Sequence, residues 1–163
     1  MNVGKKFEEL IQDSCKVAGV DCTRLKDAGW QGETTQRRFT SKNICDFILF
    51  DGERLVFAEA KTSKGDSITF DRLTQQKELI KKIDSTYLKN LHCGYLLEFR
   101  KSNKYFYISA YSVYRLQQSL DKKSFNVKDL EYYKAYGVVR CINTYLPPRK
   151  RNNRLDMGFL DKI

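Results

Sequence analysis

The sequence predicts an α/β domain in which a central mixed sheet is flanked by helices. Apolar residues recur at helical spacing near the N-terminus and again after Ser67, which predicts two long helices. Short runs rich in Ile, Leu, Val and Phe lie between and after these helices, and such runs are typical of buried strands. At 163 residues, the chain has the length of one domain with a substantial core.

The elements follow one another in a simple order. The apolar stripe of the first helix ends at Gly19, and that of the second contains Leu73, Ile80, Ile83 and Tyr87. The long elements are a helix over Gly4–Val17, a strand over Val20–Leu25, two strands within Ile44–Lys61, a helix from Ser67 to about Ser85, and strands over Cys93–Phe99 and Tyr105–Ala110. Shorter helices at Ser112–Leu120 and Val127–Tyr133 and a strand at Val138–Asn143 follow.

The segment Ile44–Lys61 reads as a hairpin that carries charge inside an apolar setting. Asp51-Gly52 suits a tight turn, because Gly readily adopts positive φ. With a loop of two residues, Asp46 lies one diagonal step from Glu59, and with a loop of four residues it lies directly opposite Glu59. Both loops place the two carboxylates and Lys61 on one face, whereas a loop of three residues breaks the grouping.

Two converging carboxylates form a site of hard oxygen ligands, which suits Mg²⁺ with Mn²⁺ as a substitute. Lys61 would place a positive charge beside whatever the metal binds. The competing interpretation is a buried ion pair with no chemistry, because buried charges are costly unless they are paired.

Composition narrows the partners and the compartment. The chain has 30 Lys and Arg against 20 Asp and Glu, and its net charge of +10 favours nucleic acid, with solubility alone as the alternative. No apolar run approaches the ~20 residues of a membrane span, and no signal peptide is visible, so we expect a cytoplasmic protein that binds no membrane. The five cysteines form no CxxC pair and His92 is the single histidine, which disfavours a zinc site.

The segment at about 26–43 lacks periodicity and is rich in Gly, Thr, Gln and charge. Long connections of this kind are often functional, although an ordinary surface loop is the alternative. We expect it to project from a single domain at 1–146, followed by a basic tail at 147–163. The expected DNA contacts are Arg24, Lys26, Arg37, Arg38, Lys42 and Lys64.

The motif Asp-x(n)-Glu-x-Lys on consecutive strands resembles that of the PD-(D/E)xK nucleases, which have a restriction-endonuclease-like core. Within that superfamily the chain resembles the RecU-type Holliday-junction resolvases of bacteria and their phages. The resemblance covers Gly4 to about Tyr111. It rests on GKKFEELI at Gly4–Ile11, CDF at Cys45–Phe47, FAEAK at Phe57–Lys61, the stretch Thr69–Gln76, and the strand pair GYLLEF and YFYI.

The resemblance implies a set of catalytic residues and a reaction. The catalytic positions of the family fall on Glu8, Asp46, Glu59, Lys61 and Gln76, with Gln75 one step from the last. Asp46, Glu59 and the carbonyl of Ala60 would bind Mg²⁺. The implied activity is symmetric cleavage of four-way DNA junctions by a homodimer. The segment at 26–43 occupies the place of the family's junction-binding stalk but is shorter and lacks its prolines.

Two other functions remain open from the sequence. The first is a different PD-(D/E)xK DNA nuclease of repair or restriction type. The second is a non-catalytic basic DNA-binding protein in which Asp46, Glu59 and Lys61 only pair with one another. The size suits a phage version, and the expected compartment is then the cytoplasm of the bacterial cell or of the infected host.

Overall fold

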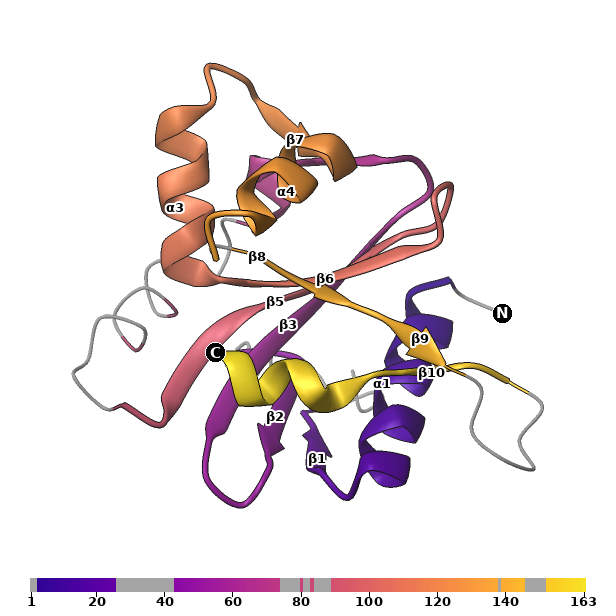
Figure 1. The fold of residues 1–163 in the computed structure, drawn as a ribbon. Coiled ribbons are helices and arrows are strands. Elements are labelled where there is room, and N and C mark those ends of the chain that lie inside the picture. Colours follow the sequence, from indigo (N-terminus) through magenta and orange to yellow (C-terminus); the bar gives the residue numbers. More distant parts are fainter. Residues whose placement is uncertain are drawn as a thin grey trace, which may run out of the picture.

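A six-stranded mixed sheet runs through the middle of the molecule in the computed structural model (Figure 1). The structure describes residues 3–25, 43–73, 80, 83, 89–137, 139–145 and 152–163. The strand order is β1-β2-β3-β5-β6-β8. The pair β3–β5 is parallel and the other neighbouring pairs are antiparallel. The predicted α/β class, with a mixed sheet and flanking helices, is therefore confirmed.

Most of the expected elements occur within one or two residues of their predicted ends. The helices described are α1 (Val3–Ala18), α3 (Ala110–Ser119) and α4 (Val127–Lys134), with the 3-10 helices η1 (Phe70–Leu73) and η2 (Met157–Lys162). The strands described are β1 (Asp21–Arg24), β2 (Phe47–Phe50), β3 (Leu55–Ser63), β4 (Ser67–Thr69), β5 (Leu91–Phe99), β6 (Lys104–Ser109), β7 (Ser124–Asn126), β8 (Val139–Ile142), β9 (Thr144–Tyr145) and β10 (Arg154–Leu155). None of the helices in these ranges is long and apolar enough to cross a membrane.

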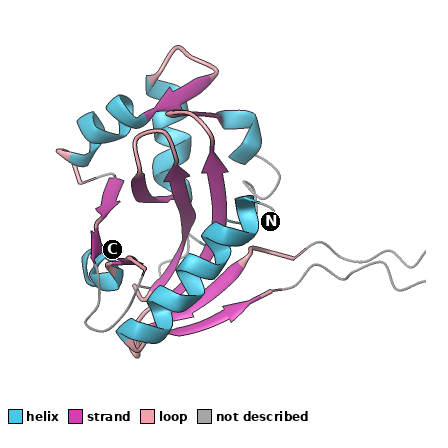
Figure 2. Cartoon of the chain, turned by 90° about the vertical axis from the view of Figure 1, so that its right-hand side faces the viewer, coloured by secondary structure: helices cyan, strands magenta, loops and turns pink. Residues whose placement is uncertain are grey.

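The sheet has a core on each of its two faces. Helix α1 lies along one face (Figure 2), where its Phe7 and Ile11 pack with Val56 and Ala58 of β3. Successive residues of a strand point to opposite faces, so the odd-numbered residues of β3 belong to the other side. That side carries the second core, to which α3, α4 and β7 contribute, and Phe57 packs against it. Figure 1 shows α3, α4 and β7 gathered together, away from α1.

The prediction of a helix beginning at Ser67 is wrong for its first part. Residues Ser67–Thr69 form β4, which pairs antiparallel with β7, and η1 follows. The cause is non-local: Ile68 is fully buried opposite Phe125, a partner that lies far along the chain. Ile80 belongs to the same core, as the predicted stripe required.

The predicted basic tail does not describe residues 152–163, which pack against α1 and the sheet. Leu155, Met157, Phe159 and Leu160 are almost fully buried in the core beneath α1. The backbone N–H of Leu155 donates a hydrogen bond of 2.9 Å to the hydroxyl of Ser14 in α1. The end of the chain, shown in yellow in Figure 1, is therefore a structural part of the domain.

Two glycines are required by the backbone geometry near the sheet. A Cβ atom on Gly94 in β5 would lie 2.5 Å from the carbonyl oxygen of Ile108 and 2.7 Å from the ring of Tyr107. Gly52, in the loop between β2 and β3, has a φ of +101°. The first glycine allows a close approach between β5 and β6, and the second allows the hairpin to turn.

The hairpin loop has four residues, 51–54, and the side chain of Asp51 organises it. Asp51 Oδ1 accepts hydrogen bonds from the amides of Glu53 (2.9 Å) and Arg54 (2.7 Å), and Oδ2 accepts one from the Arg54 guanidinium (2.8 Å). Burial works against ionisation of Asp51. The amide hydrogen bonds and the Arg54 charge outweigh it and hold the pKa of Asp51 below its ordinary value of 3.8.

We predict that Gly94→Ala destabilises the protein by about 3 kcal/mol, because a backbone oxygen and a packed ring must both move to admit a methyl group. Chemical or thermal unfolding measures this, and the expected fall in Tm is roughly 6–12 °C. Gly65→Ala is the matched control, since its Cβ atom would meet nothing within 4 Å. Equal stability of the two variants would contradict the close approach.

We also predict how Asp51 links stability to pH. A folded-state pKa below the unfolded value means that the carboxylate stabilises the fold above about pH 4 and stops doing so as the pH falls through the folded pKa. Asp51→Asn should therefore be less stable than the native chain at pH 7, and the gap should close below pH 3.8. Urea unfolding at several pH values tests this, with exposed Asp121→Asn as the control. A gap that stays constant with pH would refute it.

Candidate active site

The observed register brings Asp46 and Glu59 opposite one another. Phe50 pairs with Leu55 and Phe47 with Ala58, so the next step outward joins position 46 to position 59. Of the two loop lengths compatible with the motif, the structure has the loop of four residues. The predicted grouping of Asp46, Glu59 and Lys61 on one face is present, and that face is the one opposite α1.

Hydrogen bonds hold the two acidic side chains in place. Asp46 Oδ2 accepts a bond of 2.8 Å from the amide of Ala60, and the carbonyl of Asp46 accepts one of 2.8 Å from the amide of Leu25, the residue after β1. Glu59 Oε1 accepts a bond of 2.6 Å from the Lys61 ammonium. Asp46 is thus fixed by backbone groups on two sides, while Glu59 is paired with a side chain.

Glu59 is a buried carboxylate, and one of its two oxygens lacks a hydrogen-bond partner. The residue is 8% exposed, and its Oε2 atom has no hydrogen-bond partner among the described residues. Burial raises the pKa of Glu59. The hydrogen bond from Lys61 opposes the rise, and the neighbouring Asp46 carboxylate adds to it. A buried, unpartnered carboxylate oxygen costs free energy, which a cation bound beside it would offset.

Two neutral side chains wall the site. Tyr95 of β5 lies beside Glu59 in the parallel register, and its hydroxyl donates a bond of 2.6 Å to the carbonyl of Leu73. Burial, with the charge of Glu59 second, raises the pKa of Tyr95 above its ordinary range. Burial, with the charge of Glu59 second, also raises the pKa of the Cys45 thiol to about 11. Both groups stay protonated at neutral pH, so neither adds a charge to the two carboxylates and Lys61.

Tyr95 and Cys45 were not predicted as parts of the site. Cys45 was visible as the residue before Asp46, but its burial beside Glu59 was not. Tyr95 reaches the site through the parallel pairing of β3 with β5, two strands that lie far apart in the sequence. A local sequence pattern cannot predict how two distant strands align.

Glu8 is not brought to the acidic pair. Its carboxylate forms an ion pair with Arg24, whose register partner Phe47 is buried beneath α1. Glu8 and Arg24 therefore lie on the α1 side of the sheet, and Asp46, one residue before Phe47, points the opposite way. Among the described residues, no three His, Cys, Asp or Glu side chains form a group that could hold a metal. Two carboxylates and a backbone carbonyl are the available donors.

The predicted DNA-contacting residues and the predicted catalytic glutamine lie partly inside and partly outside the described ranges. Lys64 is exposed just after the end of β3. Arg24 is occupied by Glu8. The remaining predicted residues lie outside the described ranges: Gln75, Gln76, Lys26, Arg37, Arg38 and Lys42.

Comparison with solved structures identifies a related architecture. The fold is similar to that of Archaeoglobus fulgidus Hjc. That protein is a Holliday junction resolvase from an archaeal hyperthermophile, and the two structures superimpose with a TM-score of 0.54. The match covers 79% of this chain and 93% of Hjc, at 14% sequence identity. No family model matches the chain, and no curated protein matches it either. The similarity to Hjc shows the nuclease-like fold and does not show which reaction this chain catalyses.

Proposed function

We propose that this protein is a metal-dependent endonuclease that acts on branched DNA. The observation that carries the proposal is the buried, unpartnered Oε2 atom of Glu59, which lies beside Asp46 and Lys61 on one face of the sheet. Lys61 pairs with Oε1 alone, so a cation bound between Glu59 and Asp46 would supply the partner that Oε2 lacks.

The substrate class is supported by two independent features. The net charge of +10 favours a polyanion. Hjc, which has a similar fold, is a Holliday junction resolvase, and this points to four-way junctions as the first substrate to examine. Resolution of a junction requires two symmetric cuts, so the proposed active form is a homodimer.

The donor set fits a hard divalent cation. Asp46 and Glu59 would hold Mg²⁺, with the carbonyl of Ala60 as a further ligand, and Mn²⁺ would substitute. A bound ion of this kind lowers the pKa of its water and stabilises charge that develops at the phosphate.

The residues of the chain divide the remaining work between positioning and charge. The amide of Ala60 fixes Asp46, so this carboxylate needs no reorganisation to act as a ligand. Glu59 holds the Lys61 ammonium at 2.6 Å, on the same face as the two carboxylates. Lys61 then either neutralises a phosphate oxygen or orients the attacking water. Tyr95 and Cys45, both neutral, add no charge that would repel the phosphate.

The first test of this function is cleavage by an Asp46→Asn variant. We expect the cutting rate at saturating four-way junction to fall roughly a thousandfold, the factor that corresponds to about 4 kcal/mol of transition-state stabilisation. Binding of the junction should stay within about twofold. Asp121→Asn, an exposed change of the same chemistry, is the control. A panel of junction, flap and plain duplex tests the substrate, and undiminished cutting by Asp46→Asn would refute the assignment.

The second test measures the metal without any reaction. A ligand that binds the folded state at ten times its Kd stabilises it by about 1.4 kcal/mol, which raises Tm by roughly 3–5 °C in a chain of this size. We expect Mg²⁺ to produce such a shift in the native chain and in Asp121→Asn, but not in Asp46→Asn. An equal shift in all three proteins would place the ion elsewhere.

A further inference from the structure

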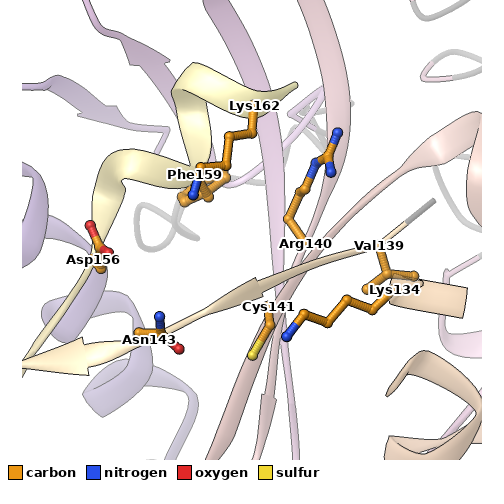
Figure 3. Close-up of a pocket in the computed structure, with 8 residues that line it drawn as sticks. All are labelled: Lys134, Val139, Arg140, Cys141, Asn143, Asp156, Phe159 and Lys162. Atoms are coloured by element: carbon orange, nitrogen blue, oxygen red, sulfur yellow. The ribbon is translucent and has the colours of Figure 1, made fainter. Parts of the chain in front are cut away.

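A hollow of about 240 Å³ lies beside the edge strand β8 (Figure 3). Three cationic side chains from three elements line it: Lys134 from the end of α4, Arg140 from β8 and Lys162 from η2. Figure 3 shows Lys134 extending along β8 toward Cys141, and Lys162 reaching down from η2. The proposed catalytic residues are not among those that line the hollow.

Non-local contacts create this arrangement. Phe159 of η2 stacks on Tyr107 of β6, with ring centroids 5.3 Å apart, and this holds η2 over the edge of the sheet. Arg140 is the register partner of Tyr107, so it points to the same face and meets η2 there. At the other end, the amide of Asp156 donates a bond of 2.7 Å to the carbonyl of Asn143.

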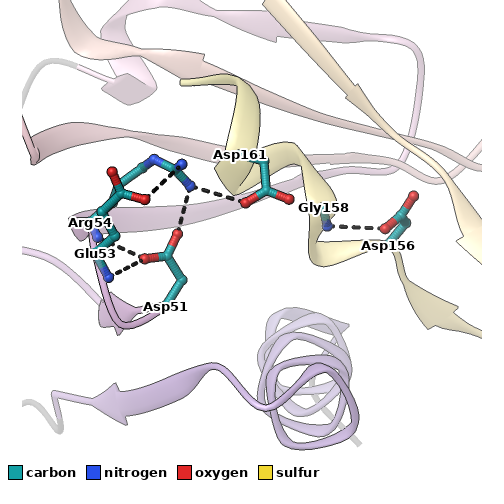
Figure 4. Close-up of polar contacts among 6 residues, drawn as sticks. All are labelled: Asp51, Glu53, Arg54, Asp156, Gly158 and Asp161. Carbon is teal, nitrogen blue, oxygen red and sulfur yellow. Dashed lines mark hydrogen bonds and ion pairs between the residues drawn. The ribbon is translucent and has the colours of Figure 1, made fainter.

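The charge of the hollow is strongly positive. No ion pair joins Lys134, Arg140 or Lys162 to an acidic group in the part of the chain that the structure describes. Asp156 also lines the hollow, but its Oδ1 atom accepts a bond of 3.0 Å from the amide of Gly158 and caps η2 (Figure 4). An anion that enters the hollow would be attracted by these cations, which no acidic partner among the described residues neutralises.

We propose that this hollow is an anion site that binds a phosphate group. The group is a backbone phosphate of DNA held by the protein, and in that respect the inference rests on the proposed function. Arg and Lys donors arranged around a concave site are the usual ligands of phosphate oxygens.

The hollow is separated from the proposed active site by the width of several strands. Val139, beside Arg140, lies on one row across the sheet with Ile108, Tyr95 and Glu59. Three spacings between neighbouring strands separate Val139 from Glu59, about 14 Å in all. Arg140 points to the face that carries η2, whereas Asp46 and Glu59 point to the face opposite α1. The hollow therefore lies apart from the proposed catalytic residues and takes no part in the reaction.

The test compares two double variants of identical chemistry and charge. Lys134→Gln with Lys162→Gln removes two cations from the hollow, and Lys101→Gln with Lys128→Gln removes two exposed cations elsewhere. Affinity for a duplex is measured at several salt concentrations by fluorescence anisotropy. Affinity for inorganic phosphate is measured by calorimetry, and Arg140→Gln serves as a second variant of the hollow.

We expect the variant of the hollow to bind duplex roughly tenfold more weakly and to lower the salt slope by about one, since each lost phosphate contact removes about 0.9. The control pair should change neither quantity. Loss of inorganic phosphate binding with unchanged DNA binding would keep the anion site but assign it to free phosphate. If all variants bind both probes like the native chain, the inference is overturned.

These outcomes are separable from the proposed function. Cutting at saturating DNA should be unchanged in the variant of the hollow, because Asp46, Glu59 and Lys61 are intact. A native chain that never cuts DNA, yet loses affinity when the hollow is altered, would refute the nuclease and leave the anion site standing. A chain that cuts DNA, but whose hollow variants bind both DNA and inorganic phosphate like the native chain, would refute the anion site and leave the nuclease standing.

Discussion

The pairing of β2 with β3 is the constraint on which the rest of the site depends. The side chain of Asp51 fixes the loop that sets the register of this pairing. Asp51 closes a loop of four residues by accepting hydrogen bonds from two amides and from Arg54. With one residue fewer in the loop, Asp46 would face the opposite side of the sheet from Glu59. Arg54 also contacts Asp161 at 3.1 Å (Figure 4), so the loop is tied to η2 at the other end of the chain.

The site stores an unfavourable interaction that the surrounding core can sustain. Glu59 is buried beside another carboxylate, and Lys61 compensates only one of its oxygens. Proteins accept costs of this kind at functional sites, where a ligand or substrate supplies the missing partner. Tyr95 and Cys45 stay neutral because burial disfavours their charged forms, and this keeps the site from accumulating further negative charge.

The C-terminal segment links the core to the cationic hollow. Its apolar residues complete the core beneath α1, and the stacking of Phe159 on Tyr107 brings Lys162 over β8. The same packing therefore stabilises the fold and concentrates positive charge at one edge of the sheet. A net charge of +10 spread evenly would steer any polyanion, whereas charge gathered in a hollow can hold a particular phosphate.

The sequence by itself determined the local features: helical spacing in α1, apolar strands and a hairpin at Asp51-Gly52. It left the length of the hairpin loop open, and the loop of four residues places Asp46 and Glu59 on one face. The local features follow from periods of a few residues, which the chain carries without reference to distant parts. Tertiary structure alone decided the features that join distant segments. Ile68 became a strand residue because Phe125 pairs with it, and residues 152–163 became core because α1 offered an apolar face. Neither partner is encoded near the segment that it fixes, so no local pattern could reveal them.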